Sequence, residues 1–184
     1  MARALTLYAY KFDELDPKVQ AKVIERWRYD DTFFWADEWR DSLKAFADHA
    51  PLTIKDWSVG YPGTYVRFEM DEDDNYGDGL GTMSGVRAWK WLMNNGWGDL
   101  ANPKDTRKSC PFTGYCGDET LLDAIRTALA NPATITSLRD VFAECLSDWA
   151  GAFEDDLDHW YSEECIREEI EANGYEFYDD GSLV

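Results

Sequence analysis

Apolar residues recur every three or four positions over much of the last third of the chain. Between residues 138 and 160 they form one continuous stripe, which is the pattern of a helix with a single buried face. Ser137 and Asp140 have the spacing of a capping box at its start, with Asp in place of the usual Glu. A second, shorter helix is expected between Ser162 and Gly174, because serine favours a helix start and glycine a helix end.

Patterns typical of helices and of strands precede these two helices. Asp16 before Pro17 is a typical helix start, and Pro51 ends a later stripe of helical spacing. Two runs rich in β-forming residues flank the turn segment 60–63 and predict an antiparallel hairpin. The sequence therefore predicts a strand over residues 4–10, a helix that begins at residue 17, helices over 35–50, 84–95 and 118–130, and hairpin strands over 52–59 and 64–70.

The order of these elements predicts an α+β, helix-dominated single domain over residues 1–184. Its small antiparallel sheet is expected to combine the N-terminal strand with the central hairpin. A length of 184 residues, with 45% hydrophobic and 15% aromatic residues, supplies one sizeable core. Ten of the thirteen glycines lie between residues 60 and 117, so this region is expected to be rich in loops.

Acidic side chains are concentrated towards the C-terminus. The chain has 37 acidic and 18 basic residues, which gives a formal net charge of −19. Residues 1–109, the near-neutral α/β part, contain 19 acidic and 15 basic residues, whereas residues 110–184, the acidic helical part, contain 18 and 3. A surface that only confers solubility normally interleaves both signs. The pattern leaves two readings open, a surface for a basic partner and a solubilising surface.

The overall charge also limits the classes of partner. An acidic protein is repelled by DNA phosphates and by anionic lipid head groups, so we expect neither direct nucleic-acid binding nor membrane binding. No apolar stretch approaches the ~20 residues that cross a bilayer, and the first residues lack the pattern of a secretory signal. We expect a cytoplasmic protein that binds a basic protein surface. The sequence leaves a homodimer open.

The sharpest candidate for a binding surface is the series of acids on the two C-terminal helices. A spacing of four residues places successive carboxylates about 6 Å apart along a helix axis. Phosphates follow each strand of duplex DNA at ~3.4 Å steps, which is a comparable charge spacing. The candidate partner-binding residues are Asp140, Glu144, Asp148, Glu154, Asp155, Asp156, Asp158, Glu163, Glu164, Glu168 and Glu171.

Candidate catalytic groups are few. His49 and His159 are the only histidines, and the sequence contains no GxSxG, HExxH or kinase signature. We therefore predict no enzymatic activity and no cofactor. A small enzyme that uses a histidine or a cysteine stays as an alternative.

The four cysteines do not have the spacing of a structural zinc site. Cys110 and Cys116 are separated by five residues, where zinc sites usually separate a pair by two to four, and Cys145 and Cys165 lie on predicted helices. The spacing favours four reduced thiols over zinc ligands. Zinc binding is left open as an alternative.

The acidic segment Asp71–Gly79 partly resembles a calcium-binding loop. Its first, third and fifth positions are acidic or amide residues, but Tyr76 stands where a glycine belongs and Thr82 where a bidentate glutamate belongs. A solvated loop is favoured, and binding of a cation or a partner is left open.

Most of the nine tryptophans are expected to be buried. Those that lie on apolar stripes are predicted to belong mainly to the core: Trp27, Trp35, Trp39, Trp149 and Trp160. Trp89 and Trp91 are two positions apart on a predicted helix and cannot share one face. One of them is therefore a candidate anchor for a partner or an oligomer contact.

Several segments resemble a known group of proteins. LYAYKFDELDPKVQAKVIERWR, FFWADEWRDSLKAF, CPFTGYCGDETLLDAIR and EANGYEFYDDG are similar to segments of uncharacterised bacteriophage and prophage proteins that are sometimes labelled as antitoxins. The similarity spans most of the chain outside 71–109. No functional residues are transferred, because the group has no established mechanism.

This resemblance implies a phage protein that acts inside a host bacterial cell. Phage proteins that are small and acidic include anti-CRISPR and anti-restriction inhibitors, several of which imitate DNA. The expected function is inhibition of a host defence complex by an acidic surface that binds its nucleic-acid-binding groove. An antitoxin that neutralises a basic toxin is the alternative, followed by a small phage enzyme.

Overall fold

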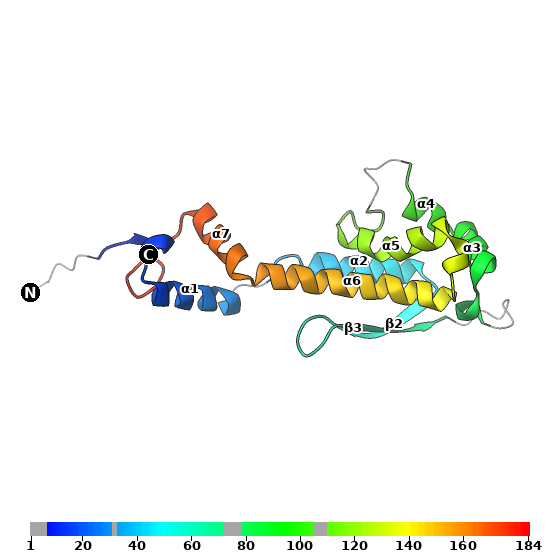
Figure 1. Cartoon of the computed structure of the whole chain (residues 1–184), viewed down its shortest axis with the longest axis horizontal. Helices are drawn as coiled ribbons and strands as arrows, with labels where there is room; N and C mark the ends of the chain where they lie inside the picture. The colour runs from blue at the N-terminus through cyan, green and yellow to red at the C-terminus, as the bar shows by residue number, and fades with distance from the viewer. Residues whose placement is uncertain (1–6, 31–32, 72–78, 105–109) are drawn as a thin grey trace, which may run out of the picture. The chain divides into compact units, whose positions relative to one another are not determined.

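The computed structural model describes residues 7–30, 33–71, 79–104 and 110–184. The chain forms two compact units, one from the segments Met1–Phe33 and Asp156–Val184 and the other from Phe34–Asp155 (Figure 1). The helix-dominated α+β class with a few antiparallel strands is confirmed. The organisation as a single domain stays a prediction.

The first unit joins the two ends of the chain. Its N-terminal half contains β1 (Tyr10–Lys11), the 3-10 helix η1 (Phe12–Glu14) and α1 (Pro17–Asp30), and its C-terminal half contains α7 (Glu163–Asn173) and β4 (Glu176–Phe177). The predicted start of α1 is confirmed, because the Asp16 carboxylate accepts the backbone N–H of Lys18 at 2.9 Å. Ser162 accepts the N–H of Cys165 at 3.1 Å at the start of α7.

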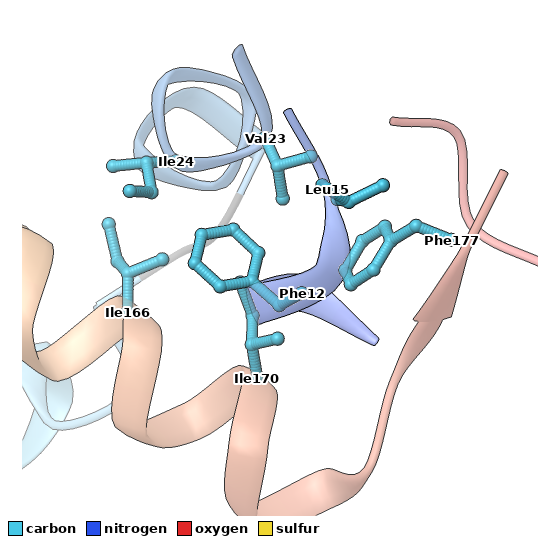
Figure 2. Close-up of a cluster of buried hydrophobic side chains, with 7 residues drawn as sticks. All are labelled: Phe12, Leu15, Val23, Ile24, Ile166, Ile170 and Phe177. Carbon is cyan, nitrogen blue, oxygen red and sulfur yellow. The ribbon is translucent and has the colours of Figure 1, made fainter. Parts of the chain in front are cut away.

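The core of the first unit is a cluster of apolar side chains that converge from η1, α1, α7 and β4 (Figure 2). The rings of Phe12 and Phe177 meet edge to face, with centroids 6.2 Å apart. The buried members of the cluster are Phe12, Leu15, Val23, Ile24, Ile166, Ile170 and Phe177.

The predicted small sheet is wrong in its composition. Strand β1 is shorter than the expected run over 4–10, of which residues 4–6 lie outside the described residues. It pairs antiparallel with β4 rather than with the hairpin. Tyr10 pairs with Phe177 and Lys11 with Glu176. The described strands therefore form two separate pairs instead of one sheet. The pairing of β1 was not predicted because β4, with two residues, is too short to leave a periodic signal in the sequence.

The second unit is built around α2, α5 and α6 and the hairpin β2–β3. The predicted hairpin and helices are confirmed, whereas the five-residue helix α4 was not predicted. The elements are α2 (Ala36–His49), β2 (Leu52–Ser58), β3 (Tyr65–Met70), η2 (Leu80–Thr82), α3 (Gly85–Asn94), α4 (Trp97–Ala101), α5 (Gly117–Ala130), η4 (Pro132–Thr134) and α6 (Leu138–Trp160), the last of which continues into the first unit.

Aromatic side chains hold α6 against α2 and the hairpin. The Trp149 indole lies fully buried, and its N–H donates to the backbone carbonyl of Trp39 at 3.1 Å. The rings of Trp39 and Phe153 stack with centroids 5.4 Å apart, and Trp57 of the hairpin meets Trp149 at 5.7 Å. These contacts fix which face of α6 is turned towards α2 and the hairpin.

The core prediction for the tryptophans holds only in part. Trp39 and Trp149 are buried and Trp27 and Trp160 are half-buried, but Trp35 is 49% exposed. The prediction for Trp35 is wrong because α2 begins at Ala36, so Trp35 precedes the helix whose stripe it was expected to join.

Candidate functional site

The candidate site begins with the way in which α6 starts. The Ser137 hydroxyl accepts the N–H of Asp140 at 3.0 Å, as the sequence predicted, and the Thr136 hydroxyl donates to the Asp140 carboxylate at 2.7 Å. These two hydroxyls lower the pKa of Asp140. Asp140 therefore contributes to the helix start, which sets it apart from the acids that follow.

One side of α6 is buried and the opposite side is acidic. Glu144, Asp148 and Asp155 are all exposed and lie within one half of the helix surface, because steps of four and seven residues return to nearly the same angle. We call these three residues the α6 acidic face. The buried side consists of Leu138, Val141, Phe142, Cys145, Leu146, Trp149, Ala150 and Phe153.

The acids of this face affect one another. Partial burial raises the pKa of Asp148, and the negative charges of Glu144 and Asp123 raise it further. Asp123 lies on α5, so the acidic surface extends onto a second helix. Sequence analysis missed Asp123, and only the spacing of Glu119 and Asp123 on one face of a helix hinted at it.

The cationic side chains near the α6 acidic face contact other groups. Arg126 forms an ion pair with Asp123 and donates to the carbonyl of Ala101 at 2.8 Å, and the Arg139 guanidinium lies 4.8 Å from the centre of the Phe68 ring. Within the part of the chain that the structure describes, no Lys or Arg forms an ion pair with the α6 acidic face. Its charge is therefore not neutralised by these neighbours.

The remaining predicted site residues surround α7 and the end of α6. Glu163 forms an ion pair with Arg167 at 2.7 Å, so its charge is partly neutralised, whereas Glu164, Glu168 and Glu171 are exposed. Asp156 and Asp158 are exposed and Glu154 is half-buried. The acids from Asp156 onwards belong to the first unit and those up to Asp155 to the second, so they form two groups, one in each unit.

The four cysteines are free thiols and do not form one cluster. Burial raises the pKa of Cys145, and burial followed by the charges of Glu168 and Glu169 raises that of Cys165. Cys110 is half-buried and Cys116 exposed. Among the residues that the structure describes, no three His, Cys, Asp or Glu side chains gather as a metal site would require. The candidate calcium loop lies at 72–78 outside the described residues, which include only its ends, Asp71 and Gly79.

The two histidines differ in their surroundings, whereas Trp89 and Trp91, the candidate anchors for a partner, are alike in theirs. Burial lowers the pKa of His49, whose ring meets that of Trp97 at 4.7 Å, while His159 is exposed on α6. Trp89 and Trp91 are both half-buried. The Trp89 indole donates to the carbonyl of Leu129 at 3.1 Å, and the Trp91 ring contacts Phe142, so both make contacts within the unit.

The backbone of the segment CPFTGYCGD is held by one buried carboxylate, that of Asp118. Asp118 is fully buried and accepts the backbone N–H groups of Phe112, Thr113 and Gly114 at 2.8, 2.7 and 3.2 Å. The Thr113 hydroxyl donates to the same side chain at 2.9 Å. This arrangement closes the loop in front of α5 and gives Asp118 a structural role.

Comparison with protein family models, with curated proteins and with solved structures finds no match to this chain. Among the described residues, no helix combines the length and the apolar character that crossing a bilayer requires.

Proposed function

We propose that this protein is an inhibitor that occupies the nucleic-acid-binding groove of another protein with the α6 acidic face. The observation that carries the proposal is the position of Glu144, Asp148 and Asp155 on a helix whose opposite side is fixed in the core. Folding thereby holds the three carboxylates in one array. A basic groove is attracted to such an array over long distances.

The spacing of the array supports imitation of a phosphate backbone. A rise of ~1.5 Å per residue separates Glu144 from Asp148 by about 6 Å and Asp148 from Asp155 by about 10.5 Å along the axis. Two and three phosphate steps of one DNA strand measure about 6.8 and 10.2 Å. The axial spacing of the three residues therefore agrees with two and three axial phosphate steps to within about 1 Å.

The expected biological setting is a bacterial cell infected by a phage. The target we favour is a CRISPR effector or a restriction complex, because both must hold nucleic acid in a basic groove. This part of the proposal is supported by the resemblance of the chain to phage proteins and by its acidic surface. The acids Glu164, Glu168 and Glu171 of α7 provide a second array in the other unit.

The proposal is tested by capture from a bacterial lysate, identification by mass spectrometry, and DNA displacement from the captured complex. Capture should fall steeply between about 50 and 500 mM NaCl, because the Debye length shortens from roughly 14 to 4 Å. The triple variant Glu144→Lys, Asp148→Lys and Asp155→Lys should lose at least about tenfold in affinity. Asp140 is left unchanged because it supports the helix start.

A matched control separates the site from net charge. The variant Asp13→Lys, Asp41→Lys and Asp99→Lys changes the net charge equally at exposed positions outside α6 and α7 and should keep its affinity. A third variant, Glu164→Lys, Glu168→Lys and Glu171→Lys, tests the α7 array. Unchanged DNA binding by the captured complex would exclude competitive mimicry, and rescue of growth from one captured toxin would instead support the antitoxin alternative.

A further inference from the structure

A groove of about 440 Å³ lies between α2 and β2 in the second unit. One wall is a single face of α2, because its members follow at three- and four-residue intervals, and the other wall is β2. The lining residues are Arg40, Leu43, Lys44, Ala47, Asp48, Leu52, Thr53, Ile54 and Trp57. None of them belongs to the α6 acidic face.

The groove runs along the edge of β2. Successive residues of a strand point to opposite faces of the sheet, so a groove over one face meets only every second residue. Leu52, Thr53 and Ile54 are consecutive, and all three line the groove. A groove that meets consecutive residues follows the strand edge, where the backbone itself is accessible.

The backbone groups on this edge have a defined direction. The N–H of Asp71 donates to the carbonyl of Pro51 at 2.9 Å, which makes these two residues a hydrogen-bonded pair of the antiparallel ladder. Because such pairs alternate, Leu52 and Ile54 direct their N–H and C=O groups away from β3. The Leu52 N–H donates to the Ala50 carbonyl at 2.8 Å, which leaves the Leu52 carbonyl and both groups of Ile54 facing the edge.

No strand in the described part of the chain pairs with this edge, because the sheet consists of β2 and β3 alone. An open edge with unpaired donors and acceptors is a template for an additional strand. The groove therefore offers both the backbone partners and the space that a short extended segment requires.

The side chains around the groove indicate what kind of segment fits. Leu43, Ala47 and Trp57 provide apolar walls, and Arg40 and Lys44 place two cations one turn apart. Arg40 pairs with Asp37 at 2.8 Å, whereas Lys44 has no ion pair among the described residues. Asp48 lies one turn further along, at the end of α2 that leads into β2, so a carboxylate in the groove is favoured towards Arg40 and Lys44.

We propose that this groove binds an extended peptide segment of a partner protein, which adds to β2 as a third strand. On the face turned towards α2, the segment carries an apolar side chain directed at Leu43, Ala47 and Trp57 and, two residues away, an Asp or Glu directed at Lys44. Charge complementarity with Lys44 selects an acidic segment, and the Ile54 N–H and C=O supply its backbone hydrogen bonds. This surface is independent of the acidic face that is proposed to bind a basic groove.

The proposal is tested with a library of random 12-residue peptides that is selected on the immobilised full-length chain. Enriched peptides should place an acidic residue two positions from an apolar residue. Their affinity should fall at least tenfold in Ile54→Pro, which removes the edge N–H, and severalfold in Lys44→Glu. Lys90→Glu makes the same charge change on α3, outside the groove, and should bind like the unchanged protein.

Amide hydrogen exchange provides a readout that does not depend on the fold of the proline variant. The Ile54 amide should exchange faster than that of Thr53 in the free protein and become protected when an enriched peptide is added. Absence of enrichment would overturn the proposal. It would also be overturned if the enriched peptides bound equally well to the unchanged protein and to the Ile54→Pro and Lys44→Glu variants. An Ile54 amide that stays unprotected with bound peptide would overturn it as well.

Discussion

Asp148 on α6 lies within electrostatic reach of Asp123 on α5. Partial burial and then the charge of Glu144 raise the pKa of Asp148, and the charge of Asp123 raises it further, so two successive helices contribute to one acidic surface. Asp123 also forms an ion pair with Arg126 one turn along α5. Like charges brought together in this way oppose folding. The arrangement therefore has a measurable effect on stability as well as a proposed role in binding.

Asp148→Asn should stabilise the protein at neutral pH. The pKa of Asp148 is raised in the folded state, so the folded state resists ionisation of this carboxyl more than the unfolded state does. The stability cost is complete above the raised pKa and disappears as the pH falls to the range where both states are protonated. Urea unfolding at several pH values should show a gain at pH 7 that vanishes in acid. Asp41→Asn controls for net charge, and a loss of stability at pH 7 in Asp148→Asn would contradict the prediction.

Asp118→Ala should destabilise the second unit by about 2–4 kcal/mol. The substitution leaves the N–H groups of Phe112, Thr113 and Gly114 without the carboxylate that accepts them. Urea unfolding measures the loss. Asp99→Ala removes an exposed acid and should change stability by less than about 0.5 kcal/mol. Equal effects of the two variants would show that the buried carboxylate does not hold the loop.

Gly117→Ala should cost about 1–3 kcal/mol through overpacking. A methyl group at residue 117 would lie 3.1 Å from the Trp39 ring and 3.2 Å from the Ser42 hydroxyl, both on α2. Gly151→Ala is the control, because a methyl group there meets nothing within 4 Å and alanine favours the helix. Thermal unfolding should give a lower midpoint for the first variant and an equal or higher one for the second.

Phe177→Ala should destabilise the first unit by about 3–5 kcal/mol, because this fully buried ring contacts Phe12 and Trp27. Hydrogen exchange should increase first at the amides of α1 and α7. Leu183→Ala, at a residue that is 49% exposed, is the milder comparison. Protection that falls in α2 and α5 but not in α1 and α7 would contradict the assignment of Phe177 to its own core.

Much of the local structure was predictable because it depends on neighbours in sequence. Asp16 and Ser162 start helices at the predicted places through local hydrogen bonds, and the apolar stripe of α6 became its buried side. Trp35 and the N-terminal strand were not predictable in the same way. Whether Trp35 is covered depends on where α2 begins, and β1 depends on a two-residue partner at the other end of the chain.

The features of the candidate site likewise divide into those that depend on neighbours in sequence and those that depend on distant segments. The sequence by itself determined the amount of negative charge, its concentration after residue 109 and its placement opposite an apolar helix stripe, because all three depend on composition and on helical period. The contacts of Asp140 at the start of α6 and the pair of Glu163 with Arg167 are local contacts over three or four residues. Only the tertiary structure decided that Asp123 lies close enough to Asp148 to affect it. It also decided that Ile54 faces an open strand edge. These features depend on side-chain contacts and on the pairing of separate segments, which the helical period does not specify.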